Sequence, residues 1–157
     1  MEYRIRRLAV ADAAEFARFR MLMFQEMGEI ADAAEAEDFR RRMIPHLETV
    51  IADGSFVGWL AESGGTVLGA GGANVFHRLP TPTDRAGKEL YLLNMYTVPD
   101  YRGFGIAAAI VEAAKALARE QGANRIWLTA TDAGRPVYAK ADFVPTESEM
   151  QFTLGPH

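Results

Sequence analysis

The residues best suited to chemistry form a short turn in the second half of the chain. They are Arg102, Gly103, Phe104, Gly105, Ile106 and Ala107. Residues 90–98, before the turn, form an apolar run typical of a strand, and residues 106–121, after it, repeat with a helical period. A turn from a strand into a helix presents unpaired backbone N–H groups and the positive end of the helix dipole. Because glycine lets the backbone approach a ligand closely, the pattern predicts a phosphate-binding turn.

The rest of the sequence predicts the elements that position this turn. Periodicity and turn residues indicate, in order, a strand at 3–8, a helix at 12–27, a helix ending near 52, strands at 56–62 and 66–76, the strand at 90–98, the helix at 106–121, a strand at 125–129, a short helix at 135–140 and a last strand at 148–154. Pro45 is expected to interrupt the second helix or to begin its second half. The fold class is α/β, close to α+β: one mixed, largely antiparallel sheet flanked by helices, in a single domain over residues 1–157.

Composition excludes several classes of function. The chain has 157 residues, a hydrophobic fraction of 49% and a net charge of −4, which is the balance of an ordinary globular domain and argues against nucleic acid as a partner. It has no cysteine, so disulfides, thiolate metal sites and cysteine nucleophiles are excluded. The three histidines are far apart and show no ligand spacing, so we expect no metal. No apolar run is long enough for a membrane helix, and we expect a cytoplasmic protein without membrane contact.

Two glycine-containing segments and an acidic stretch also need an interpretation. Residues 69–72 are glycine-rich but lie within a predicted strand, so close packing is favoured over dinucleotide binding. Gly87 and Lys88 lack the earlier glycine and the Ser/Thr of a P-loop. The acidic residues between 29 and 38 indicate a solvated face, with steering of a cationic substrate as the alternative.

The turn resembles the acyl-CoA signature of GNAT-type N-acetyltransferases, Arg/Gln-x-x-Gly-x-Gly/Ala. Arg102, Gly105 and Ala107 occupy its three fixed positions. The resemblance covers nearly the whole chain and implies the acyl-CoA N-acyltransferase fold, with acetyl-CoA as cosubstrate. It implies that the turn binds the pyrophosphate and that the preceding strand splays from its neighbour to meet the pantetheine arm. The cofactor-binding residues so implied are Met95, Tyr96, Thr97, Arg102, Gly103, Phe104, Gly105, Ile106, Ala107 and Ala108.

Downstream, residues 135–143 resemble the family's Leu-Tyr-x-x-x-Gly-Phe segment. The resemblance implies that Tyr138 is the catalytic general acid, and an unperturbed tyrosine is protonated at neutral pH, as this role requires. Asp142 stands where the family usually has glycine, and it tolerates the left-handed conformation better than most residues do. Thr131 stands where some members have an asparagine that contacts the cofactor.

We therefore expect an enzyme that moves an acetyl group from acetyl-CoA to a primary amine by direct transfer in a ternary complex. The general base stays open among Glu26, Glu89, His77 and Asn94 with an ordered water. An α-amine needs little help from a base, because an appreciable fraction of it is neutral near its pKa of about 8. The rival functions are a non-catalytic acyl-CoA-binding or sensing module and, more distantly, a dinucleotide-binding oxidoreductase.

The acceptor, a small molecule or a peptide amine, is not identified by the sequence. We expect it to approach from the side bounded by the acidic stretch and the loop at residues 77–88. Glu29, Asp32 and Glu35 would then raise the local concentration of a cationic amine. A homodimer is expected by resemblance alone.

Overall fold

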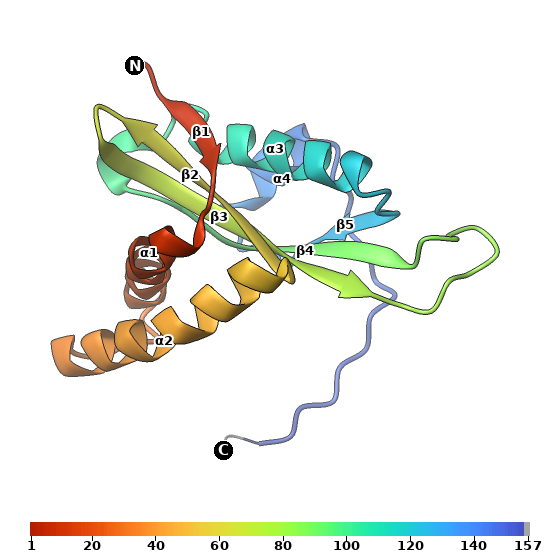
Figure 1. The fold of residues 1–157 in the computed structure, drawn as a ribbon, viewed down its shortest axis with the longest axis horizontal. Coiled ribbons are helices and arrows are strands. Elements are labelled where there is room, and N and C mark those ends of the chain that lie inside the picture. Colours follow the sequence, from red (N-terminus) through yellow and green to blue (C-terminus); the bar gives the residue numbers. More distant parts are fainter. Residues whose placement is uncertain (156–157) are drawn as a thin grey trace.

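The protein folds into a five-stranded sheet with helices on both faces (Figure 1). The computed structural model describes residues 1–155. The strands are β1 (Arg4–Arg7), β2 (Phe56–Ser63), β3 (Thr66–His77), β4 (Lys88–Thr97) and β5 (Arg125–Trp127). The α-helices are α1 (Ala13–Glu26), α2 (Ala33–Asp53), α3 (Ile106–Glu120) and α4 (Arg135–Lys140), and the 3-10 turns are η1 (Val10–Asp12) and η2 (Pro99–Tyr101). This confirms the expected mixed, largely antiparallel sheet flanked by helices.

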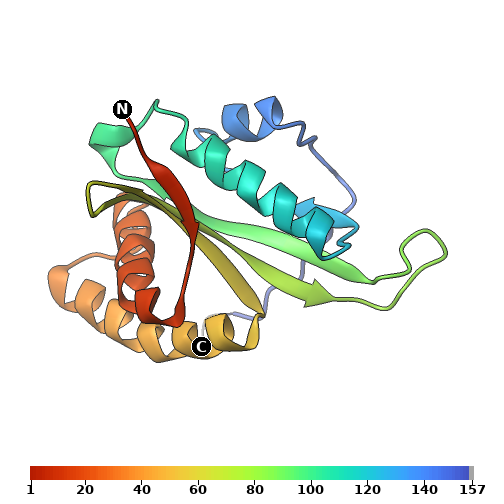
Figure 2. The ribbon, with the colours of Figure 1, turned by 45° about the horizontal axis from the view of Figure 1, so that its top comes forward.

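The sheet has the strands in sequence order, β1-β2-β3-β4-β5. All neighbours are antiparallel except β4 and β5, which α3 connects as a parallel pair. Helices α1 and α2 cover one face, and α3 and α4 cover the other (Figures 1 and 2). Each face has its own core cluster, one built against α1 and α2 and one against α3. Within residues 1–155, no helix has both the length and the apolar character that crossing a membrane requires.

The glycines of β3 allow both layers to pack closely on the sheet. A Cβ atom on Gly69 would lie 2.8 Å from Ile106 Cγ2, and one on Gly71 would lie 2.9 Å from Ile110 Cγ2. Both isoleucines belong to α3 and are buried. On the opposite face, a Cβ atom on Gly72 would overlap the ring of Phe56. The prediction that these small residues serve packing is therefore confirmed.

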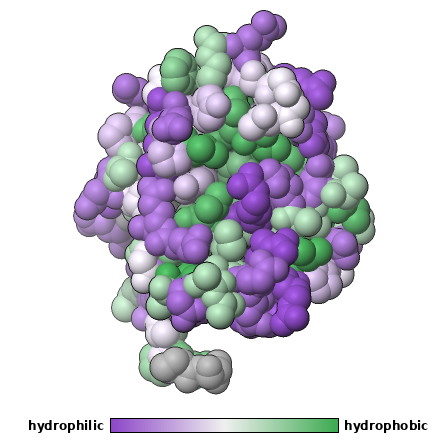
Figure 3. Space-filling model, turned by 90° about the vertical axis from the view of Figure 1, so that its left-hand side faces the viewer, coloured by the Kyte–Doolittle hydropathy of each residue, from purple (hydrophilic) through white to green (hydrophobic). Residues whose placement is uncertain are grey.

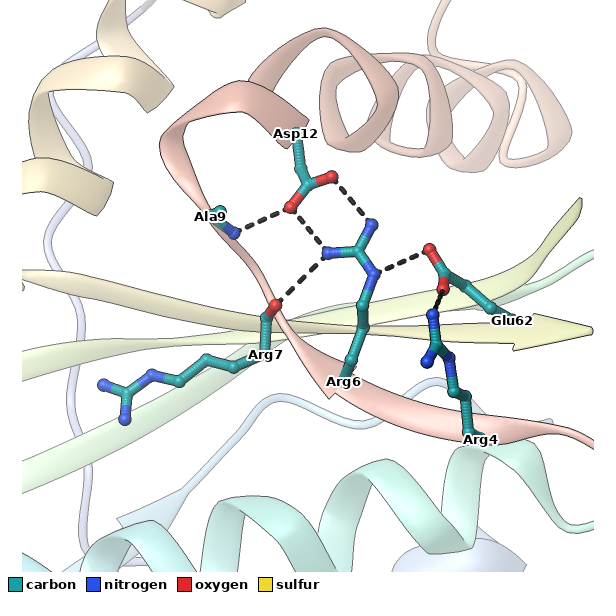
Figure 4. Close-up of polar contacts among 6 residues, drawn as sticks. All are labelled: Arg4, Arg6, Arg7, Ala9, Asp12 and Glu62. Atoms are coloured by element: carbon teal, nitrogen blue, oxygen red, sulfur yellow. Dashed lines mark hydrogen bonds and ion pairs between the residues drawn. The ribbon is translucent and has the colours of Figure 1, made fainter. Parts of the chain in front are cut away.

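An ion-pair network ties the first strand to the first helix (Figure 4). Arg6 donates two hydrogen bonds to Asp12, at 2.7 and 2.8 Å, and one to Glu62 at 2.7 Å. Asp12 also accepts the backbone N–H of Ala9 at 2.7 Å. The Arg6 guanidinium, through its hydrogen bonds, holds the pKa of Asp12 below its ordinary value. The network thus joins β1, the start of α1 and β2.

Two expectations are corrected. Helix α2 runs without a break across Pro45, which removes one backbone hydrogen bond but leaves Ala36 and Leu47 buried on the same helix. The strand expected at 148–154 is absent from the described residues, because no strand of the chain pairs with this segment there. Its alternating Met150, Phe152 and Leu154 stay exposed, and Glu149 contacts β5 only through its side chain, with 2.6 Å to Arg125.

Strands β4 and β5 separate soon after they begin. Their pairing covers Glu89 with Arg125, Leu90 with Ile126 and Tyr91 with Trp127, and ends there. A bulge follows in β4 where Asn94 has a φ of 57°, while pairing with β3 continues to Thr97. From residue 93 to 97, the side of β4 that faces away from β3 therefore has no strand partner among the described residues.

Candidate active site

The turn between β4 and α3 has the geometry of an anion-binding site. Gly103 and Gly105 have φ of 84° and 80°, in the left-handed region that glycine alone adopts without strain. Gly105 is the N-cap of α3, and no side chain caps the helix there. The first turn of α3 contains no acidic residue, so its free N–H groups keep their positive potential. Residues 102–105 are exposed, and the turn is open to a ligand.

Two contacts from distant elements hold the turn in place. The Tyr3 hydroxyl donates a hydrogen bond to the carbonyl oxygen of Phe104 at 3.2 Å. Arg102 donates to the carbonyl oxygen of Thr97 at 2.9 Å and to Glu26, at the end of α1, at 2.7 Å. The Arg102 side chain is thus used to fasten the turn to β4 and α1. Its backbone, with Gly103 and Phe104, leads into the helix start formed by Ile106, Ala107 and Ala108.

Met95, Tyr96 and Thr97 lie on the unpaired stretch of β4 beside this turn. The side chain of Met95 packs between Gly71 and the α3 core, whereas that of Tyr96 meets Phe19 of α1 with ring centroids 6.0 Å apart. The side chains point into opposite faces of the sheet, which leaves the backbone groups of the strand edge to meet a ligand. Since β5 does not pair with this stretch, its outward backbone N–H and C=O groups are not used by a neighbouring strand among residues 1–155.

Tyr138 lies on α4, on the α3 side of the sheet, where it packs against the core cluster of that face. Its backbone carbonyl accepts the N–H of Phe143 at 3.0 Å, and Asp142 adopts a φ of 67° to close this turn. The prediction that Asp142 takes the left-handed conformation in place of a glycine is confirmed. Burial, and to a lesser degree the Tyr91 phenol, raises the pKa of Tyr138 to about 12. The phenol therefore stays protonated over the whole neutral range.

The loop before α4 is fixed by Thr131. The Thr131 hydroxyl accepts the backbone N–H of Gly134 at 3.1 Å, and its carbonyl accepts that of Arg135 at 3.1 Å. Thr131 therefore orients the start of α4, which carries Tyr138.

The four candidate bases occupy different environments. Glu26 pairs with Arg102, which lowers the pKa of the carboxyl and makes it a weaker base. Glu89 is buried and pairs with Arg78 at 3.0 Å. His77 ends β3, about 30 Å along the sheet from the signature turn, because β3 runs antiparallel to β4 from Thr97 to Lys88. Asn94 is buried at the bulge of β4, and its amide nitrogen has no partner among residues 1–155.

The acidic stretch and the loop after β3 do not bound one common side. The loop at residues 78–87 projects from one end of the sheet, and the signature turn lies at the opposite end. The α1–α2 connection lies at the same end as the signature turn (Figures 1 and 2). The expectation that both border the acceptor is therefore wrong. In the acidic stretch, Asp32 caps α2 by accepting the N–H of Glu35 at 2.9 Å, and Glu35 accepts that of Ala31 at 2.9 Å.

Sequence reasoning missed three side chains near the site: Tyr3, Tyr91 and Arg20. Tyr91 packs on Trp127 of β5, with ring centroids 4.5 Å apart, and lies where the two strands begin to separate. Arg20 reaches from α1 towards Asn94 of β4. In the sequence, Tyr91 and Arg20 stand out only as an aromatic residue and an arginine within periodic segments. Their residue types do not reveal which distant element each side chain contacts.

The face on which β4 ends and α3 begins is shown in Figure 3. Apolar side chains reach the surface in its middle, between hydrophilic ones (Figure 3). Phe104 is one of the exposed apolar residues of the chain, at 51%. A ligand with both apolar and charged parts matches such a surface.

Comparison with known proteins agrees with this geometry. Residues 17–143 match the acetyltransferase (GNAT) family. A GCN5-related N-acetyltransferase from Ralstonia eutropha JMP134 is similar at 33% identity, with a TM-score of 0.82, and the match covers 98% of this chain and 99% of that one. A predicted acetyltransferase from Clostridium acetobutylicum, whose crystal structure contains acetyl-CoA, is similar at 25% identity and a TM-score of 0.83, over 97% and 96% of the two chains.

More distant structures share the fold alone. Glucosamine-6-phosphate N-acetyltransferase from Arabidopsis thaliana has 16% identity and a TM-score of 0.71, with 99% of this chain and 100% of that one covered. No curated protein matches the sequence. Since the family match spans most of the chain and includes the signature turn and Tyr138, the chain belongs to the GNAT acetyltransferase family and is an acyltransferase.

Proposed function

We propose that this enzyme transfers the acetyl group of acetyl-CoA directly to a primary amine within a ternary complex. The observation that carries the proposal is the unpaired edge of β4 at residues 93–97, which leads directly to the positive-φ glycines at the start of α3. An extended pantetheine arm suits the edge, and a pyrophosphate suits the turn. The family membership of the chain supports the same assignment.

Each part of the site has a role in this proposal. Backbone N–H groups of residues 103–108 bind the pyrophosphate, and the backbone of Met95, Tyr96 and Thr97 binds the pantetheine arm. A backbone N–H of this edge polarises the thioester carbonyl and stabilises the oxyanion formed when the amine attacks. The ammonium nitrogen of the tetrahedral intermediate loses a proton to solvent. When the C–S bond breaks, Tyr138 gives its proton to the departing thiolate, the neutral amide is released, and solvent returns a proton to the phenol.

The acceptor amine needs little assistance from a base in this scheme. Glu26 is engaged with Arg102, and Glu89 with Arg78. An amine with a pKa of about 8 is neutral, and so able to attack, in an appreciable fraction at physiological pH. A lysine-type amine with a pKa of about 10.4 is almost entirely protonated there. We therefore place amines whose pKa is lower than that of lysine ahead of lysine-type amines as acceptors.

We also propose a homodimer, as the family resemblance suggests. The exposed apolar side chains of Met150, at 99%, and Phe152, at 87%, support it, because they alternate as in a strand and pair with no strand among residues 1–155. Light scattering coupled to gel filtration should give twice the monomer mass for the wild type and the monomer mass for M150D/F152D. A monomeric wild type would contradict the dimer and leave the transfer reaction unaffected.

The transfer reaction is tested with a panel of amines, scored by CoA release and by the mass of the acetylated product. Initial rates against both substrates should give intersecting double-reciprocal lines, as a ternary complex requires; parallel lines would indicate an acyl-enzyme. Binding of acetyl-CoA without turnover of any amine would favour the acyl-CoA-binding module. Protection by NAD against thermal unfolding, without protection by acetyl-CoA, would favour the oxidoreductase.

A further inference from the structure

A pocket of about 180 Å³ lies between α1, α2 and the sheet, outside the acetyl-CoA site described above. Its walls are largely apolar, from Phe16, Met43, Leu47, Val50, Phe56 and Leu93. Three polar side chains complete the lining: Arg20, His46 and Asn74. No carboxylate is among the residues that line it. The pocket therefore offers hydrogen-bond donors and a positive charge in an apolar setting.

Arg20 differs from the other arginines of the same region. Arg18 pairs with Glu15 at 2.7 Å, and Arg102 pairs with Glu26 at 2.7 Å. Arg20 is partly buried and, among residues 1–155, has no carboxylate within 4.0 Å. It donates a hydrogen bond to the side-chain oxygen Oδ1 of Asn94 at 3.5 Å and lies over the ring of Phe24 at 4.9 Å. Burial lowers the pKa of Arg20, and no carboxylate opposes this effect. A guanidinium withdrawn from water without a counter-ion is costly, and an anionic ligand would remove that cost.

The neighbouring Asn94 provides a second unsatisfied donor. Its side-chain oxygen faces Arg20, which can only donate, so its amide nitrogen points elsewhere. That nitrogen is buried and has no partner among the described residues. A buried amide donor without an acceptor is uncommon and suits a ligand oxygen. Arg20 thus lacks a carboxylate partner, and the adjacent Asn94, which is not among the residues that line the pocket, has an amide nitrogen without an acceptor.

Tyr91 lies between the lining of this pocket and the point where β4 and β5 separate. Asn74, which lines the pocket, is the cross-strand neighbour of Tyr91, so both side chains lie on the α1–α2 face of the sheet. The Tyr91 phenol is close enough to influence the pKa of both Arg20 and Tyr138. Tyr91 also lies where β4 and β5 separate. A small acceptor held at Arg20 would therefore extend from the pocket towards the separation of the two strands.

We propose that this pocket binds the carboxylate of the amine acceptor, with the Arg20 guanidinium as its counter-ion, so that the substrate class is apolar α-amino acids. This inference rests on the function proposed above. The apolar walls fit an uncharged side chain, and a planar guanidinium binds a carboxylate through two parallel hydrogen bonds.

The test compares each acid with its own amide. The probes are L-phenylalanine with L-phenylalaninamide and L-leucine with L-leucinamide. Because acid and amide differ in amine pKa, the measured quantity is the ratio of their kcat/KM values in a variant divided by the same ratio in the wild type. R20Q should lower this double ratio by about 10- to 100-fold, the effect of losing one charge-assisted bidentate contact, and leave the KM for acetyl-CoA unchanged. R20K should keep part of the preference, since it retains the charge.

The matched control is R18Q, two residues away on the same helix, where Arg18 already has Glu15 as a partner. It should leave the double ratio near one. An unchanged double ratio in R20Q would overturn the inference. A structural role for Arg20 would instead lower the Tm of R20Q and reduce turnover of acid and amide equally, which would also overturn it.

Failure of the proposed function is distinguishable from failure of this inference. If the wild type releases no CoA with any amine, the function fails, and calorimetry with the same probes then tests the pocket alone. L-phenylalanine should bind the wild type more tightly than R20Q, whereas L-phenylalaninamide should not distinguish them. Equal binding of the acid by both proteins would overturn the pocket's assignment.

Discussion

Gly105 has two properties that a substitution can separate: a left-handed φ of 80° and a place at the start of α3. Gly105→Glu should abolish acetyl-CoA binding, because a side chain and a negative charge would enter the space in front of the helix N-terminus. The nearest atom to a Cβ at this position is the Tyr3 hydroxyl at 3.6 Å, so the fold has room for the change. Calorimetry with acetyl-CoA measures the effect.

Gly122 provides the matched control for that variant. Its φ is 67°, and a Cβ atom there would meet nothing within 4 Å, but it follows the C-terminal end of α3. Gly122→Glu should therefore cost similar stability, about 1 kcal/mol for a side chain in the left-handed region, and bind acetyl-CoA as the wild type does. Equal affinity of the two variants would contradict the assignment of the pyrophosphate site.

Tyr138 should act in the chemical step and not in cofactor binding. Tyr138→Phe keeps the ring that packs against Phe143 at 5.9 Å and removes only the proton, so kcat should fall by roughly 10²-fold with little change in acetyl-CoA affinity. A near-normal kcat, measured where chemistry limits the rate, would reduce Tyr138 to a packing residue.

The raised pKa of Tyr138 predicts a further difference between the same two proteins at high pH. The folded-state value is about 12 and the ordinary value 10.0, so the neutral phenol contributes stability that is complete below pH 10 and is lost as the pH rises towards 12. An ultraviolet titration of tyrosinate should show one group near pH 12 in the wild type that is missing in Tyr138→Phe. A wild-type curve in which that group titrates near pH 10 would contradict the burial argument.

At the scale of elements, the start of α2 decides how the acidic stretch can be tested. Asp32 and Glu35 form hydrogen bonds that cap this helix, so replacing them by alanine would change the helix as well as the charge. The variant E29Q/D32N/E35Q removes the charges and keeps the capping groups. If the stretch attracts a cationic acceptor, this variant should raise the acceptor KM and flatten its dependence on salt, with the KM for acetyl-CoA unchanged. Wild-type acceptor kinetics at low salt would show that the stretch is only a solvated face.

The order and type of the elements could be predicted from the sequence, because each has a strong local pattern. The apolar runs of β2 and β3, the glycine turn before α3 and the helical period of α3 are examples. The end of the chain was different: Met150, Phe152 and Leu154 alternate as in a strand, but a strand also needs a neighbour, and alternation does not reveal one. Likewise, the turn and Tyr138 could be named, whereas the approach of Tyr3 to Phe104 and of Arg20 to Asn94 depends on tertiary packing.

For the whole molecule, the Arg6 network should carry much of the stability of the N-terminal region. Asp12→Ala should lower the free energy of unfolding by about 2 kcal/mol, because it removes a partly buried carboxylate that accepts three hydrogen bonds. Since the pKa of Asp12 is lowered in the folded state, this contribution is present above the unfolded value of about 3.9 and is lost as the pH falls below it. Urea unfolding at neutral and acidic pH measures both effects. The control is Asp38→Ala, which removes only exposed ion pairs and should change the free energy of unfolding little. Equal losses of stability in the two variants would contradict the role of the network.

The separation of β4 from β5 has a consequence for amide exchange with deuterium. The amides of residues 93–97 that point away from β3 have no neighbouring strand to protect them among the described residues, although β4 is an inner strand of the sheet. They should exchange much faster than the amides of β2 and β3, and loading with acetyl-CoA should slow them selectively, since the ligand would then occupy the place of a strand. Mass spectrometry of the peptide containing these residues would report this protection without any knowledge of the acceptor. If the proposal is right, acetyl-CoA thus supplies the hydrogen-bonding partner that β5 does not give to this part of β4.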